Sequence, residues 1–163
     1  MLLRKHLSAF KIYIFLLVVS SSTLISGLSY FSTINFIVYS FVHILLIYIT
    51  IYHFKIILYF VFFITGMILD IFLLNEIGPH IVILMILIPL LNRAKKVIST
   101  LSSLRVYVFI IFILIIVFFL EMMISLLLFN FDFQIKYLLK YIYISLIISY
   151  PTFYFFSKID RIG

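Results

Sequence analysis

Long runs of apolar residues constrain this chain more than any other feature, because they recur along nearly its whole length, as in VYVFIIFILIIVFFL. Each run is close to the roughly 20 helical residues that cross a hydrocarbon core about 30 Å thick. Apolar residues make up 67% of the sequence and charged residues only 10%, whereas a soluble domain is about half apolar and a quarter charged. The sequence therefore predicts an integral membrane protein with one transmembrane domain, residues 1–163.

The apolar runs predict helices. A transmembrane β-barrel needs strands of about ten residues that alternate polar and apolar side chains, and these runs do not alternate. Polar breaks predict an all-α bundle of six transmembrane helices with spans at 12–29, 35–53, 56–74, 79–91, 106–129 and 137–156. The fourth is shorter than a bilayer requires, so we expect it to extend into its flanks, to tilt or to enter the membrane only partway, with Pro89 as a kink site.

Lysine and arginine predict the orientation, because they remain preferentially in short cytoplasmic loops. One set of alternating loops holds Arg4, Lys5, Lys11, Lys55, Arg93, Lys95, Lys96, Arg105, Lys158 and Arg161. Of the twelve basic residues, only Lys136 and Lys140 fall on the opposite side. This asymmetry predicts six spans with both termini in the cytoplasm. The beginning of the chain, RKHLSAFK followed by an apolar run and SSST, also resembles a signal peptide, so processing of this segment is an alternative.

Composition argues against several kinds of partner and cofactor. The net charge of +7 does not indicate nucleic-acid binding, because the basic residues lie between spans and not on one water-exposed face. The absence of cysteine excludes disulfides and thiolate metal sites. His43, His53 and His80 lie on different segments without HExxH spacing. We therefore expect neither a metal nor a cofactor.

Three ionisable residues fall at similar depths inside the predicted spans. Asp70 lies about four residues, or roughly 6 Å, below the outer boundary, and Glu121 and His43 lie about eight residues, or roughly 12 Å, below it. A charge near a helix centre costs about 3 kcal/mol, so such groups normally face the bundle interior, pair or stay neutral. Lys140 is a candidate partner for either carboxylate. Three roles stay open: contacts that hold helices together, a ligand or proton pathway, and catalysis.

The sequence around Asp70 predicts close helix packing beside a tight turn. Gly66 lies one helical turn before Asp70, on the same face, where a missing side chain lets a neighbouring backbone approach. Gly78 and Pro79 then end a short loop and begin the next helix, because proline is tolerated in a first helical turn. We expect Asp70 to be held just before this outer turn.

The segment GMILDIFLLNEIG resembles the hallmark of the MreD family, small membrane subunits of the bacterial rod-shape machinery. That hallmark is a glycine, an aspartate four residues on and a second glycine eight later, here Gly66, Asp70 and Gly78. Similar features are the basic loop NRAKK after the fourth span, Glu121 in the fifth span, and Pro151 followed by a basic tail. The resemblance implies a scaffold without enzymatic activity in the bacterial inner membrane.

The resemblance also implies partners and a fold. The expected partners are MreC, the RodA glycosyltransferase with its transpeptidase, and indirectly the actin-like MreB filaments, in support of peptidoglycan synthesis and cell shape. The implied fold is similar to the substrate-binding subunits of energy-coupling-factor vitamin transporters. The basic turn of Arg93, Lys95, Lys96 and Arg105 is expected to contact anionic lipids or a cytoplasmic partner.

Two other functions fit some of these sequence features. A vitamin-transporter subunit would suit the same fold, but such subunits usually carry an alanine-spaced docking face on the first helix, and Ala9 is the only alanine there. An intramembrane aspartyl protease needs two aspartates, one acid and one base. Only Asp70 is placed for that role, although Glu121 could act as its partner, and the GxGD sequence of such proteases is absent.

Overall fold

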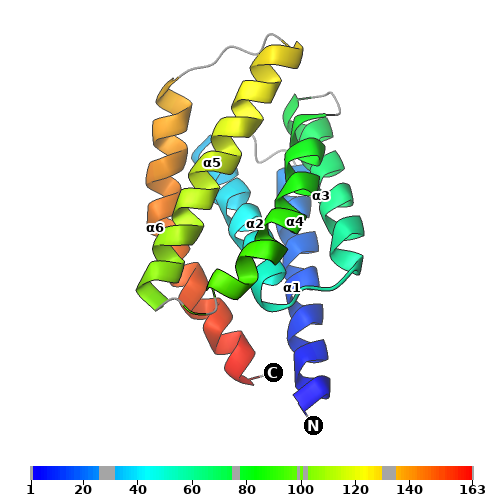
Figure 1. Ribbon diagram of the computed structural model, residues 1–163. Coiled ribbons are helices and arrows are strands. Elements are labelled where there is room, and N and C mark those ends of the chain that lie inside the picture. The colour runs from blue at the N-terminus through cyan, green and yellow to red at the C-terminus, as the bar shows by residue number, and fades with distance from the viewer. Residues whose placement is uncertain are drawn as a thin grey trace.

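The structure, a computed structural model, describes residues 2–25, 32–74, 78–98, 100, 103–129 and 135–162. Every regular element within these ranges is an α-helix: α1 (Leu2–Ile25), α2 (Ser32–Tyr52), α3 (Ile57–Leu74), α4 (Pro79–Ile98), α5 (Ser103–Phe129) and α6 (Ile135–Ile162). Consecutive helices run in opposite directions, and the two chain ends lie at the same end of the bundle (Figure 1). The prediction of an all-helical bundle is confirmed for these residues.

Three helices extend at one end by six or more residues beyond the predicted spans. α1 begins at Leu2 instead of residue 12, because the basic segment before the apolar run is itself helical. α4 continues to Ile98, so the fourth apolar run is part of a 20-residue helix that contains Pro89. α6 continues to Ile162, beyond the predicted end at residue 156. Residues 26–29 of the first predicted span lie outside the described ranges.

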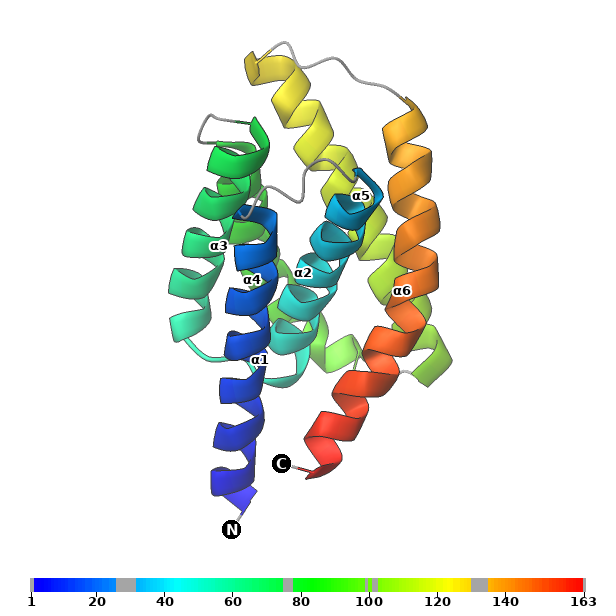
Figure 2. The same ribbon diagram turned by 180° about the vertical axis from the view of Figure 1, so that it is seen from behind.

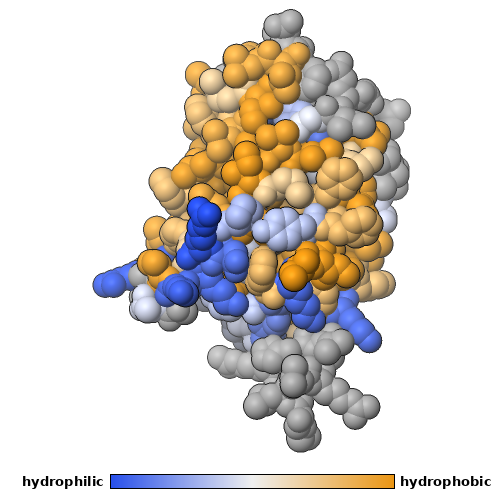
Figure 3. Space-filling view, turned by 45° about the vertical axis from the view of Figure 1, so that its right-hand side comes forward, coloured by the Kyte–Doolittle hydropathy of each residue, from blue (hydrophilic) through white to orange (hydrophobic). Residues whose placement is uncertain are grey.

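Within the described ranges, length and composition make three of the helices suitable for crossing a membrane. The apolar stretches are Thr33–Tyr52, Leu104–Leu128 and Ile135–Asp160, and shorter ones occupy Ala9–Leu24 and Ile57–Ile71. Hydrophobic residues cover much of one face of the molecule, and hydrophilic residues gather toward the end that carries the termini (Figure 3). Side chains such as Phe112 and Leu127, 60% and 75% exposed, belong to this outer apolar surface. Such a surface suits lipid as its solvent.

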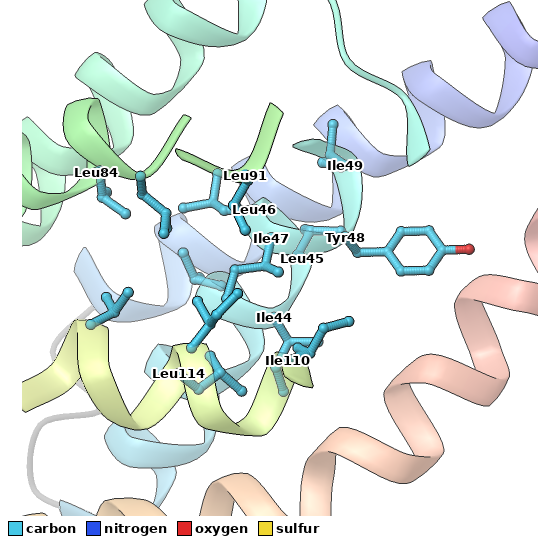
Figure 4. Close-up of a cluster of buried hydrophobic side chains, with 14 of the residues drawn as sticks. Ile44, Leu45, Leu46, Ile47, Tyr48, Ile49, Leu84, Leu91, Ile110 and Leu114 are labelled. Carbon is cyan, nitrogen blue, oxygen red and sulfur yellow. The ribbon is translucent and has the colours of Figure 1, made fainter. Parts of the chain in front are cut away.

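Helix α2 is the central element of the bundle. It packs against α1, α4, α5 and α6, and every residue from 42 to 51 is buried. A helix that is hydrophobic all round is expected to be surrounded by other helices. Figure 4 shows Leu46 of α2 beside Leu91 of α4, and Ile44 of α2 near Ile110 of α5, whereas Tyr48 points away from this group. This position lets polar residues on α2 reach several helices at once. Figure 2 shows the arrangement from behind, with α1 and α6 on either side of α2.

Candidate functional site: a buried network of carboxylates and histidines

The side chain of Asp70, near the end of α3, caps the beginning of α4. Its Oδ2 accepts hydrogen bonds from the backbone N–H groups of Gly78 (2.9 Å) and Ile81 (3.2 Å), and its Oδ1 accepts one from the N–H of His80 (2.9 Å). The first N–H groups of a helix have no partner within the helix, and Pro79, the first residue of α4, has no N–H at all. Asp70 therefore performs from the preceding helix the function that an N-cap side chain usually performs.

Gly66 allows α3 and α4 to lie close enough for this cap. A Cβ atom at Gly66 would lie 2.8 Å from the Cα and 3.0 Å from the backbone nitrogen of Ile81. Side-chain carbons do not approach backbone atoms this closely, so any larger residue would push the helices apart. Ile81 is also one of the residues whose N–H binds Asp70. The glycine and the aspartate thus act on the same turn of α4, and the structure brings Gly66, Asp70, Gly78 and Pro79 together.

From Asp70 a chain of polar contacts continues into the bundle. The imidazole of His80 contacts the Oδ1 of Asp70 through Nδ1 (2.7 Å) and the hydroxyl of Tyr39 through Nε2 (3.1 Å). The Tyr39 hydroxyl contacts the Oε2 of Glu121, and the Oε1 of Glu121 contacts the Nε2 of His43 (3.1 Å). The Nδ1–H of His43 donates to the backbone carbonyl of Tyr39 (2.9 Å). We call these five side chains, from α2, α3, α4 and α5, the buried network.

The buried network is shielded from solvent by the bundle itself. Asp70 and His43 are fully buried, and Glu121, His80 and Tyr39 are between 2% and 6% exposed. The Tyr39 ring packs edge-on against Phe118 and Tyr141, which stack on each other with centroids 3.9 Å apart. Each carboxylate has both oxygens engaged by protein groups. Buried charges are stabilised only when they are paired and hydrogen-bonded in this way.

Three of these five residues are candidates that the sequence alone predicts. Asp70, Glu121 and His43 were predicted at similar depths in the membrane, and the structure links them through two further side chains. His80 and Tyr39 were not predicted as members. Tyr39 lies one helical turn before His43, so the i, i+4 relationship on α2 was an available signal. His80 follows the helix-starting proline, which places its side chain beside the turn that Asp70 caps.

The other candidate residues are Pro151, Lys140 and the basic turn. Pro151 is exposed on α6. The ammonium group of Lys140, expected as a partner for a carboxylate, lies 5.2 Å from the ring centroid of Phe36, and the carboxylates of the network contact histidines. The basic turn begins at the end of α4 and continues to the start of α5, with Arg93, Lys96 and Arg105 exposed and Lys95 half-buried.

A second polar cluster, which the sequence analysis did not predict, lies at the end of the bundle that carries the termini. The carboxylate of Asp160 on α6 accepts hydrogen bonds from the hydroxyls of Tyr13 on α1 (2.6 Å) and Tyr48 on α2 (2.5 Å). The Nε2 of His53, just after α2, lies 3.0 Å from the Oδ1 of Asp160. We call these four residues the Asp160 clamp. It fixes the last turns of α6 and explains why this helix continues past residue 156.

Apolar side chains separate the two clusters along α2. Between His43 of the buried network and Tyr48 of the clamp lie Ile44, Leu45, Leu46 and Ile47, all fully buried. These side chains form the centre of the apolar core in Figure 4. The two clusters are therefore separate polar sites, and a layer of buried apolar side chains lies between them.

Comparison with known proteins does not identify a family. No protein-family model, no curated protein and no solved structure matches this chain. Within the described ranges, no group of three or more His, Asp and Glu side chains is placed to hold a metal ion. The fold and the site define the chain as a helical bundle with membrane-suited helices and a buried network that joins four of them.

Proposed function

We propose that this protein is a non-catalytic scaffold of the bacterial cell-elongation complex, a member of the MreD family in the inner membrane. In this proposal all six helices cross the membrane and both termini are cytoplasmic. The protein binds MreC and works beside RodA, its transpeptidase partner and, indirectly, MreB.

The observation that carries the proposal is the hairpin of α3 and α4. The family resemblance depends on Gly66, Asp70 and Gly78. These three residues act together where α3 packs against the beginning of α4. Asp70 caps α4, Gly66 permits the close approach, and Gly78 donates one of the capping hydrogen bonds. A motif with this role fixes the relative position of two helices, which is what a scaffold requires of its docking surface.

The hydrogen bonds of the carboxylates also support the proposed scaffold function. A general acid or base must reach the proton of a bound substrate, and a binding site needs polar groups that converge on a cavity. Here both oxygens of Asp70 and both oxygens of Glu121 bind groups of the protein itself. These bonds favour helix positioning over catalysis or ligand binding.

The distribution of charge supports the proposed orientation. Lys55 lies between α2 and α3, the basic turn between α4 and α5, and Lys158 near the end of α6. These connections lie at the end of the bundle that carries the termini (Figure 1). Basic residues favour the cytoplasmic side and anionic lipid head groups. The basic turn of Arg93, Lys95, Lys96 and Arg105 is then a contact for anionic lipids or for a cytoplasmic partner.

Co-purification with MreC of the same bacterium tests the proposal. With both proteins expressed together and extracted in a mild detergent, a tag on this chain should retain MreC. An unrelated bitopic membrane protein expressed at the same level serves as the control for non-specific capture. A location of the gene beside that of MreC would be a further supporting result.

The proposal fails if well-expressed MreC is not retained in several mild detergents. Thermal stabilisation of the purified chain by a vitamin would instead favour the transporter subunit. Loss of biological function in an Asp70→Asn variant that remains fully assembled would favour a chemical role for the carboxylate.

A further inference from the structure

The buried network has a proton requirement that can be counted from its contacts. Four side-chain contacts join its members in series: Asp70 with His80, His80 with Tyr39, Tyr39 with Glu121, and Glu121 with His43. In each contact both atoms are oxygen or imidazole nitrogen, so each needs one proton between them to be a hydrogen bond. The bond from the Nδ1 of His43 to the Tyr39 carbonyl needs a fifth proton, because a carbonyl only accepts.

The side chains in their usual states at neutral pH do not supply five protons. Two neutral imidazoles and one phenol carry three, and two ionised carboxylates carry none. In two of the five contacts the two atoms would then face each other with lone pairs and no proton between them. The network would also carry a net charge of −2. A buried polar group without a partner, and a buried charge without a counter-charge, are both strongly unfavourable. Two additional protons complete every contact and bring the net charge to zero.

The contacts also show where one of these protons lies. Asp70 accepts three backbone N–H bonds, which suit an ionised carboxylate, so the proton of its contact with His80 lies on Nδ1. With Nε2 donating to Tyr39, His80 is an imidazolium. The second additional proton lies between Glu121 and His43, whose Nδ1 is already a donor.

The Asp160 clamp provides an internal comparison, because its carboxylate is contacted only by groups that carry a proton in their neutral forms. Its three contacts are made by two phenol hydroxyls and one imidazole on a single carboxylate. Each of these groups carries a proton in its neutral form. Both clusters contain histidine beside a carboxylate, yet in the clamp each contact to the carboxylate has its own neutral donor. The Tyr13 hydroxyl also lies 3.1 Å from the backbone carbonyl of Phe156, a second acceptor for the same proton.

The groups that face the network come from five helices. They are Tyr39 and His43 of α2, Asp70 of α3, His80 of α4, Glu121 of α5 and Tyr141 of α6, whose ring centroid lies 5.7 Å from that of Tyr39. Tyr13 of α1 belongs to the clamp. The two carboxylates, the two histidines and the two tyrosines are therefore the titratable groups that face one another at this site.

We propose that the buried network is a binding site for two protons, which the protein takes up when its helices assemble. Above about pH 7.5 the imidazoles of the unfolded chain are mostly deprotonated, since their ordinary pKa is about 6.5. The folded chain then holds two more protons than the unfolded chain. The sign follows from linkage: stability falls as pH rises wherever the folded state binds more protons. This inference is independent of the proposed partner MreC.

The test is the pH dependence of unfolding in mild detergent. The folding equilibrium constant, from reversible denaturation by sodium dodecyl sulfate, should fall by about 100-fold per pH unit between pH 7.5 and 8.5, which corresponds to two protons. In Glu121→Gln the amide can donate to His43 and accept from Tyr39 without an additional proton. The slope should then fall to about tenfold per unit. The matched control, His53→Gln in the clamp, should keep the wild-type slope.

A direct measurement of proton release does not depend on any variant. When wild-type protein unfolds in weakly buffered solution at pH 8, a pH-indicator dye should report about two protons released per chain. Release of two protons, with a lower slope in Glu121→Gln than in His53→Gln, would support the two-proton site. No proton release, a wild-type slope of tenfold per pH unit or less, or equal slopes in the two variants would overturn it.

Discussion

Removal of the Asp70 carboxylate is the most direct test of the hairpin that joins α3 and α4. In Asp70→Ala the N–H groups of Gly78, His80 and Ile81 lose their acceptor, and the His80 imidazole loses its partner at 2.7 Å. The bonds from Gly78 and Ile81 are partly buried, so water can replace part of what they lose. The two bonds from His80 are fully buried.

The expected loss of stability follows from the two buried bonds. A buried polar group without a partner costs about 1–3 kcal/mol, and removal of one member of a buried charged pair costs about 3–5 kcal/mol. We expect Asp70→Ala to lower the free energy of unfolding by about 3–5 kcal/mol. Circular dichroism during denaturation by sodium dodecyl sulfate, in mild detergent at pH 7, measures this change.

Two further variants make the result specific. Asp70→Asn keeps one acceptor oxygen for backbone N–H groups, so its loss should lie between those of the wild type and Asp70→Ala. Ser157→Ala removes a hydroxyl that bonds only the exposed carbonyl of Tyr154 on α6, and it should change stability by less than about 0.5 kcal/mol. A loss below about 1 kcal/mol in a folded Asp70→Ala protein would refute the capping role.

Three other substitutions probe the remaining contacts. Gly66→Ala should cost about 1–3 kcal/mol, because its Cβ would lie 2.8 Å from the Cα of Ile81; an unchanged unfolding midpoint would contradict the close approach. Tyr39→Phe removes the hydroxyl that joins His80 to Glu121 and should cost about 1–3 kcal/mol in the same assay, whereas wild-type stability would mean that the hydroxyl does not join them. Asp160→Ala removes the carboxylate that binds Tyr13, Tyr48 and His53 and leaves the Tyr48 hydroxyl without its acceptor, so limited proteolysis should cut the last turns of α6 faster than in the wild type, and equal rates would argue against the clamp.

The sequence alone determined the helical character of the chain and the approximate ends of most helices, and it predicted similar membrane depths for Asp70, His43 and Glu121. These properties depend on distance along a helix axis, which follows from residue number at about 1.5 Å per residue. The role of Gly66 and Pro79 was also accessible, because a close approach and a helix start have local signatures.

Only the tertiary structure decided which side chains meet. The pairing of Asp70 with His80 and of Glu121 with His43, the link through Tyr39, and the convergence of Tyr13, Tyr48 and His53 on Asp160 depend on how each helix is rotated about its axis and which helix is its neighbour. In a chain whose helices are apolar on nearly every side, hydrophobic periodicity gives little information about that rotation. The few buried polar groups do, because each must find a partner inside the bundle.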